Sequence, residues 1–185
     1  MTHIDPHRSA LLIIDMEKAF VNPGAALWIR GAMETVPRIA TVIEEARAIG
    51  VPVIWVKRIY QADGSDMEIP RRRELFSRGL YGVLAPESTG LNSIEEPEGL
   101  ERKPDEKVII KPRFSAFFTR NWMSICAARK LTLFCWLVQP RRIVSAVLVM
   151  MRYPWIIDVL SWNFAVRHRA DTLEILEMMS KGIFF

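Results

Sequence analysis

Two short aliphatic runs of this chain each end at an ionisable residue. Asp15 follows Leu11–Ile14, and Lys111 follows Val108–Ile110. Unbroken aliphatic runs of this length are typical of parallel strands that are buried on both faces. In open α/β sheets, ligands bind beyond the carboxyl ends of such strands. We therefore predict that Asp15 and Lys111 meet at one sheet edge, either as a base and a cation or as a buried ion pair only.

The segments between these runs alternate between helical and extended patterns. Residues 36–49 predict an amphipathic helix, with Thr35 as its N-cap and Gly50 as its stop. Its apolar face comprises Ile39, Val42, Ile43 and Ala46. Residues 51–60 are rich in Val, Ile, Trp and Tyr and predict a second strand, and the third strand ends at Lys111. This alternation calls for parallel strands joined by right-handed crossovers.

Residues 61–105 interrupt the alternation with a long, charged stretch. Its four prolines are Pro70, Pro86, Pro97 and Pro104. We interpret it as an insertion or lid that holds a short helix near Arg73. A chain of 185 residues, half of them apolar, can bury one sizeable core, so we predict a single domain over residues 1–185.

Composition narrows the setting of the chain. The first ten residues are mostly polar and the apolar run ends at Asp15, so we expect no secretory signal. The longest candidate membrane span, residues 131–151, is broken by Gln139–Arg142. Two cysteines give no disulfide framework, and a reducing cytoplasm is the expected location.

The residues around the two charges carry a more specific signal. The stretches Ala10–Phe20 and Lys111–Phe118 resemble the isochorismatase-like cysteine hydrolases, which include nicotinamidases, N-carbamoylsarcosine amidases and ureidoacrylate amidohydrolases. The resemblance covers residues 8–118 and a tail from about residue 167. It implies an α/β, Rossmann-like, three-layer α-β-α sandwich with a mostly parallel central sheet.

The same resemblance implies an activity. In such enzymes an aspartate is the general base, a lysine orients and stabilises charge, and a cysteine that opens a later helix is the nucleophile. Asp15 and Lys111 match the first two roles. The implied reaction is hydrolysis of a C–N bond in a small amide or ureido compound, and the family is expected to form homo-oligomers.

We predict no metal and no cofactor. Nicotinamidases of this superfamily carry an Asp-x-His metal motif after the second strand, whereas residues 55–60 contain no histidine. His3, Asp5 and His7 have a chelating spacing, but an N-terminal tail is usually mobile and solvated. No glycine pattern matches a dinucleotide fingerprint.

Other candidate residues each allow two interpretations. Phe20, Phe117 and Phe118 line the substrate pocket or belong to the core. The run of arginines at 71–73 is a solvated face or part of a lid that recruits a carboxylate. His168 precedes a predicted helix at residues 170–179 and is a surface or interface residue.

The character of the sequence changes between residues 121 and 164. This window holds four of the six tryptophans and both cysteines, but Asp158 is its only acidic residue. At the density found in the rest of the chain it would contain about six acidic residues. The window also accounts for the whole net charge of +4.

Several interpretations of this window compete. Its basic residues are too sparse for a nucleic-acid patch, and the charges of a membrane hairpin would fall in mid-run. We therefore expect neither a nucleic-acid nor a membrane partner. The window is otherwise a divergent tryptophan-rich core, a segment that does not pack, or a stretch written out of phase with the gene from which the family pattern descends.

The out-of-phase interpretation can be tested on the sequence itself, because tryptophan and methionine have a single codon each. The shifted frame takes the last base of one codon together with the first two bases of the next. In the shifted frame, Asn121–Cys126 permits Leu-Asp-Glu-His-Leu, an amphipathic pattern with an acidic first turn. Met150–Ile157 permits Asp-Ala-Val-Ser-Leu-Asp-Tyr, which resembles the helix after the nucleophile. Trp162–Asn163 forces a glutamate. We hypothesise two compensating insertions or deletions, near residues 120 and 166.

The shifted frame also permits a cysteine astride Ile143 and Val144. This is about 33 positions beyond Lys111, where the resemblance requires the nucleophile. As written, neither residue has a nucleophilic group. Cys135 lies in an apolar run and is expected to face a buried strand environment, where thiols are inert, and Cys126 is a weaker replacement still. The chain is thus either a cysteine-dependent hydrolase or a catalytically inactive binding or scaffold protein.

Overall fold

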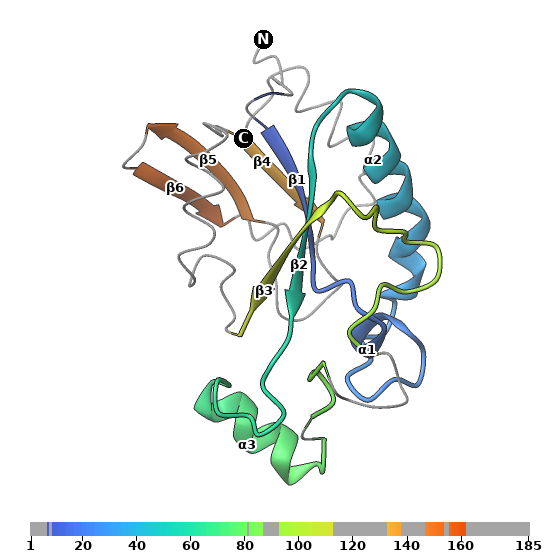
Figure 1. The fold of residues 1–185 in the computed structure, drawn as a ribbon, viewed down its shortest axis with the longest axis vertical. Helices are drawn as coiled ribbons and strands as arrows, with labels where there is room; N and C mark the ends of the chain where they lie inside the picture. Colours follow the sequence, from blue (N-terminus) through green and yellow to red (C-terminus); the bar gives the residue numbers. More distant parts are fainter. Residues whose placement is uncertain are drawn as a thin grey trace.

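The computed structural model describes residue 7, residues 9–80, 82–86 and 93–112, and the backbone of strands at 133–137, 147–153 and 156–161. Figure 1 shows a sheet with one long helix along one side and a short helix beyond the strand ends. The sheet has six strands in the order β3-β2-β1-β4-β5-β6. The bounds are β1 Ser9–Ile14, β2 Val53–Arg58, β3 Lys107–Lys111, β4 Leu133–Leu137, β5 Val147–Tyr153 and β6 Ile156–Ser161.

The four strands β3, β2, β1 and β4 run parallel to one another. Leu11 of β1 pairs with Val53 of β2 and, on the other side, with Cys135 of β4. Val56 of β2 pairs with Ile109 of β3. The three predicted strands are confirmed, although β2 is shorter at both ends than residues 51–60. The carboxyl ends of β1, β2 and β3 therefore share one edge of the sheet.

The long helix α2, Val36–Ala48, is the predicted amphipathic helix. Its buried residues include the four that were predicted, and they pack on Leu11, Ile13, Val53 and Trp55 of the sheet. Gly50 ends the helical segment with a φ of +77°, a conformation that suits glycine. Thr35 occupies the N-cap position, as predicted, but its side chain makes no capping hydrogen bond. It belongs to the 3₁₀ turn η2, Met33–Thr35, and its Oγ1 donates to Ala32 O at 2.7 Å.

The strands β5 and β6 depart from the expected crossovers. β5 pairs antiparallel with β4 and also with β6, with a register shift between Met151 and Tyr153. The α/β class and the mostly parallel sheet are nevertheless confirmed. The helix predicted at residues 170–179, together with His168, lies outside the described residues.

The insertion at residues 61–105 contains the predicted short helix, α3, Ile69–Ser77. It lies beyond the carboxyl ends of β2 and β3 (Figure 1). A second apolar cluster anchors it and joins Tyr60 and Phe20, the latter from the short helix α1, Lys18–Val21, to Leu75 of α3. In the described part of the chain, no helix is long and apolar enough to cross a membrane.

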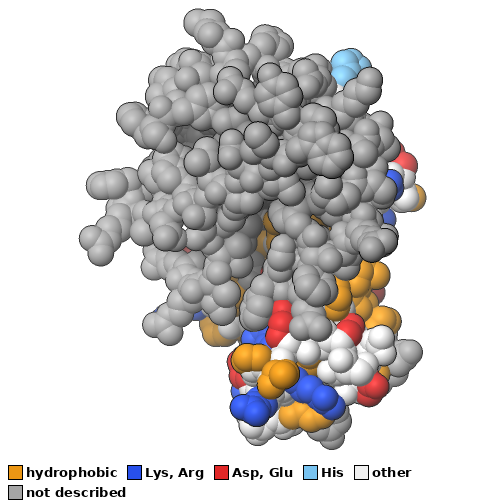
Figure 2. Space-filling view, turned by 90° about the vertical axis from the view of Figure 1, so that its left-hand side faces the viewer, with side chains coloured by type: hydrophobic (Ala, Val, Ile, Leu, Met, Phe, Trp, Pro, Cys, Tyr) orange, Lys and Arg blue, Asp and Glu red, His pale blue; other side chains and the backbone are white. Residues whose placement is uncertain are grey.

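The lobe built around α3 carries side chains of both signs next to apolar ones (Figure 2). Arg72 and Arg73 of α3 are exposed, as predicted for the arginine run, but the Arg71 side chain is only 13% exposed. Arg71 pairs with Glu74 at 3.0 Å, and Arg72 lies over the ring of Phe76. Recruitment of a carboxylate by these arginines stays a prediction.

Candidate active site

Asp15 occupies an unusual backbone conformation directly after β1. Its φ is +54°, and it is the only non-glycine residue with positive φ among the residues that the structure describes. Aspartate and asparagine tolerate this left-handed region better than other side chains. The Asp15 N–H donates to Val56 O at 3.0 Å, which ties the turn to β2. The chain thus bends sharply where the predicted base stands, as is common at functional sites.

Asp15 and Lys111 meet as predicted. Lys111 Nζ donates to Asp15 Oδ2 at 2.9 Å across the carboxyl ends of β1 and β3. Their side chains are only 7% and 3% exposed. An ion pair removed from water in this way is costly to form and more costly to break, because the remaining charge would be left uncompensated.

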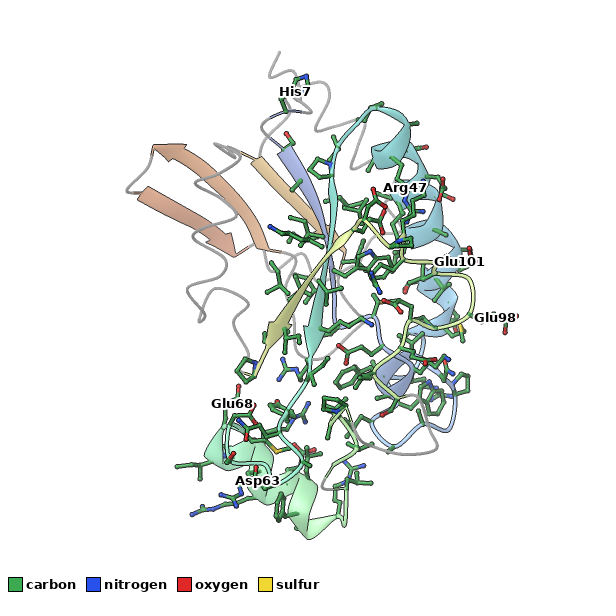
Figure 3. The ribbon with its side chains drawn as sticks, viewed as in Figure 1. His7, Arg47, Asp63, Glu68, Glu98 and Glu101 are labelled. Carbon is green, nitrogen blue, oxygen red and sulfur yellow. The ribbon has the colours of Figure 1, made fainter. Side chains whose placement is uncertain are left out.

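Arg58, the last residue of β2, supplies a second cation that the sequence interpretation missed. Its Nη2 lies 3.5 Å from the same oxygen, Asp15 Oδ2, and its Nη1 donates to Tyr60 Oη at 3.1 Å. Tyr60 Oη in turn donates to Glu68 Oε2 at 3.3 Å. Glu68, labelled in Figure 3, directly precedes α3. A sequence signal for Arg58 was present, because an ionisable residue ends β2 and β3 and directly follows β1. Arg58 was missed because the second strand was predicted to run on to Tyr60.

Glu17 is the second missed residue. It is 0% exposed, and its Oε1 accepts a hydrogen bond from the backbone N–H of Arg58 at 2.5 Å. Its spacing of two from Asp15 was the available signal. Four ionisable side chains therefore meet at one sheet edge, contributed by the ends of β1, β2 and β3.

Burial and the neighbouring polar groups together shift the pKa values of Lys111, Arg58 and Tyr60. It lowers the pKa of Lys111 from its ordinary value, while the carboxylate of Asp15 acts in the opposite direction. Burial also opposes the charge of Arg58, but Asp15 and the Tyr60 hydroxyl prevail and the pKa of Arg58 is raised. Burial raises the pKa of Tyr60, and the charge of Arg58 offsets part of this rise. Tyr60 therefore remains a neutral donor for Glu68.

An open cavity of about 480 Å³ adjoins this cluster. It is lined by Ile59, Tyr60, Gln61, Ala62, Asp63, Asp66, Pro86 and Ile110. Tyr60 belongs both to the cavity wall and to the hydrogen-bonded cluster. A small molecule that contacts Tyr60 in the cavity would therefore touch a direct hydrogen-bond partner of Arg58.

The sequence resemblance implies a strand-end carboxylate paired with a lysine, and Asp15 and Lys111 form such a pair. Similarity to known proteins then identifies the family. The model of the isochorismatase domain matches residues 9–133. The chain belongs to the isochorismatase family. It is 32% identical over 180 residues to a "probable inactive nicotinamidase" of Arabidopsis thaliana, a match that covers 95% of this chain and 90% of the relative.

Solved structures agree with this assignment. An isochorismatase family protein from Desulfovibrio vulgaris is 39% identical, with a TM-score of 0.61 over 70% of this chain and 67% of that one. A cysteine hydrolase from Pseudomonas syringae pv. phaseolicola is 28% identical, with a TM-score of 0.63 over 75% of this chain. This family member spans only 63% of the length of that hydrolase.

The other predicted site residues are only partly placed. Phe20 is buried in the cluster with Tyr60 and Leu75, and its contact with a substrate stays a prediction. Cys135 lies in β4 beside β1, as the strand prediction required. Phe117, Phe118, Cys126, Ile143 and Val144 lie outside the described residues.

The expectation of a metal-free site is not tested by the structure. Within residues 9–80, 82–86 and 93–112, no three His, Cys, Asp or Glu side chains form a group that could hold a metal ion. His7 is exposed, and its predicted companions His3 and Asp5 lie outside the described residues.

Proposed function

We propose that the family member described here is built for metal-independent, cysteine-dependent hydrolysis of a C–N bond in a small amide or ureido compound. The observation that carries the proposal is the 2.9 Å contact between Lys111 Nζ and Asp15 Oδ2, buried at the carboxyl edge of the sheet. That edge is where α/β sheets bind small ligands.

The chemistry follows from the two charges. Asp15 takes the proton of a thiol, and the resulting thiolate attacks the carbonyl carbon of the substrate. Lys111 holds the Asp15 carboxylate in place and stabilises the negative charge that develops nearby. The family resemblance implies that backbone N–H groups at the start of the nucleophile's helix stabilise the oxyanion. The proton returns to the leaving amine as the C–N bond breaks, and water then hydrolyses the thioester.

Hydrolysis of a panel of small amides and ureido compounds, by the chain with residues 121–164 translated in the alternative frame, tests this proposal. Turnover that is lost in Asp15→Asn and in Lys111→Met, and blocked by a thiol-reactive reagent, would support it. Turnover that survives Asp15→Asn would overturn the role of Asp15. Exposed Glu98→Gln is the matched control for the substitution of a carboxylate by an amide.

The nucleophile is the incomplete part of the triad. We infer that residues 121–164 are written out of phase and that the cysteine lies in the alternative frame at Ile143 and Val144. The depletion of acidic residues in this window and the forced aspartates and glutamate of the shifted codons support this inference. The nucleotide sequence from Lys111 to His168 tests it: stop codons in the second frame, or no cysteine codon there, would overturn it.

A second candidate function is that of an inactive binding or scaffold protein with the same fold. It is favoured by the aliphatic residues at positions 143 and 144 and by the Arabidopsis relative named a probable inactive nicotinamidase. The amide panel separates the two candidates, because cysteine-dependent turnover by the chain as written excludes an inactive protein.

A further inference from the structure

Glu17 is a fully buried carboxyl group with little to stabilise a charge. Its Oε1 accepts one hydrogen bond, from the backbone N–H of Arg58 at 2.5 Å. Its Oε2 is buried and has no hydrogen-bond partner among the described residues. A buried carboxylate is normally held by a cation or by several donors, because its desolvation is otherwise too costly. One backbone donor is a small complement for a full negative charge.

The cations around Glu17 are already engaged with other carboxylates. Lys57, from within β2, and Lys111, at the end of β3, lie close enough for their charges to act on its titration, whereas Arg58 acts on it through its backbone N–H. Lys111 pairs with Asp15 at 2.9 Å, Arg58 pairs with the same Asp15 oxygen at 3.5 Å, and Lys57 pairs with Glu96 at 2.9 Å. Lys111 and Arg58 share Asp15, and among the described residues no ion pair joins any of these three cations to Glu17, so the Glu17 carboxyl group has no counter-ion of its own.

Electrostatics point in the same direction. Burial and, after it, the negative charge of Asp15 raise the pKa of Glu17 well above its ordinary value of 4.5. The Arg58 N–H, Lys57 and Lys111 act against this rise without cancelling it. Two carboxyl groups in one site with separated protonation states are the usual arrangement of acid–base chemistry.

We propose that Glu17 is held as a neutral acid at neutral pH and acts as a positioning residue, leaving Lys111 and Arg58 to Asp15. Its hydrogen bond fixes the backbone at the end of β2, from which the Arg58 side chain reaches Asp15. Loss of the Glu17 proton places a second negative charge beside Asp15, which competes for Lys111. The inference rests on the proposed role of Asp15 as the base.

The direct test is a titration of glutamate and aspartate side-chain carboxyl carbons by ¹³C NMR, with the Glu17 signal assigned in the wild-type chain. We expect this signal to titrate at a higher pH than the signals of exposed glutamates, because burial and the charge of Asp15 raise the pKa of Glu17. A Glu17 signal that titrates together with the other glutamates overturns the proposal. Because the assignment is made in the wild-type chain, the result does not depend on any variant folding.

The positioning role has its own readout. In the wild-type chain, we expect the Asp15 carboxyl signal to shift as Glu17 loses its proton. Glu17→Gln keeps the shape and the neutral state and should remove that shift. Exposed Glu98→Gln, at the outer edge of the molecule in Figure 3, should leave it in place. An Asp15 signal that does not respond to Glu17 overturns the positioning role.

These measurements need no substrate and therefore separate this inference from the proposed function. A raised Glu17 titration supports the neutral acid even where the chain with residues 121–164 translated in the alternative frame hydrolyses no amide, a result that overturns the hydrolase. An ordinary Glu17 titration in an active enzyme does the opposite. In an active enzyme, Glu17→Gln should also extend activity to higher pH than in the wild-type chain.

Discussion

At the scale of single residues, the site depends on one aspartate oxygen that two buried cations share. Asp15→Asn keeps a side chain that suits the left-handed backbone but removes the charge. Because Lys111 would then be buried without its counter-ion, we expect the free energy of unfolding to fall by about 3–5 kcal/mol. Urea denaturation measures this loss.

The double variant Asp15→Asn with Lys111→Met provides the control. Removing both charges relieves the uncompensated lysine, so the double variant should lose less stability than the sum of the two single variants. Strictly additive losses would contradict a direct interaction between the two side chains.

Glu17 gives a pH-dependent prediction. Its pKa is higher in the folded chain than its ordinary value of 4.5, so its stabilising contribution is complete below pH 4.5 and is lost as the pH rises through the folded value. Relative to Glu17→Gln, the wild-type chain should therefore lose stability with rising pH, by at most about 1.4 kcal/mol per pH unit. Equal slopes in the two chains would contradict a raised Glu17 pKa.

The sequence predicted the pair and missed its supports for a physical reason. Asp15 and Lys111 end aliphatic runs, and strand direction alone brings such residues together. Arg58 joins the site because its side chain reaches Asp15. Glu17 joins it because its carboxyl group accepts a hydrogen bond from the backbone of β2. Those details depend on tertiary packing, which one-dimensional periodicity does not contain.

At the scale of elements, Glu106 links the helix to the sheet. Its carboxylate accepts hydrogen bonds from Arg47 of α2 at 2.8 Å and from Trp55 Nε1 of β2 at 2.8 Å. It also accepts one from Lys103 N at 3.0 Å, in the turn before β3. Burial opposes its charge, but the bonds from Arg47 and Trp55 prevail and the pKa of Glu106 is lowered. This carboxylate therefore stabilises the packing of α2 only while it is ionised.

Glu106→Gln should lower the free energy of unfolding by about 1–3 kcal/mol at neutral pH. Since the folded pKa is depressed, this contribution is present above the ordinary value of 4.5 and disappears as the pH falls through the folded value. Urea denaturation at several pH values measures the difference. A loss that is as large in acid as at neutral pH, or that Glu98→Gln reproduces, would contradict the role of this carboxylate.

The regular elements were predictable where local pattern and fold agree. The aliphatic runs and the spacing of apolar residues 39, 42, 43 and 46 predicted β1, β3 and α2 within a few residues. The antiparallel pairing of β5 and β6 was not predicted, because the interpretation followed the shifted frame, in which residues 150–157 resemble a helix. The residues of β5 and β6 are rich in Val, Ile and Leu, and β-branched residues such as Val and Ile favour strands.

At the scale of the whole molecule, the chain joins two parts of different sequence character. Residues 9–112 hold Asp15, the cations and the helix α2 in a consistent α/β pattern. The window at 121–164 contributes β4 in the parallel direction and then an antiparallel pair. If the frames were restored, residues 150–157 would gain an acidic, helical pattern. We expect circular dichroism of the chain translated in the alternative frame to show more helix than the chain as written, and equal spectra would contradict the shift.

Hydrolysis of the amide and ureido panel by three proteins tests the central claim most directly. They are the chain as written, the chain with residues 121–164 translated in the alternative frame, and that second chain carrying Asp15→Asn. We predict that only the second protein releases amine from a substrate. Turnover by the chain as written, or equal turnover by the second and third proteins, would contradict a triad of Asp15, Lys111 and a cysteine lost from positions 143 and 144.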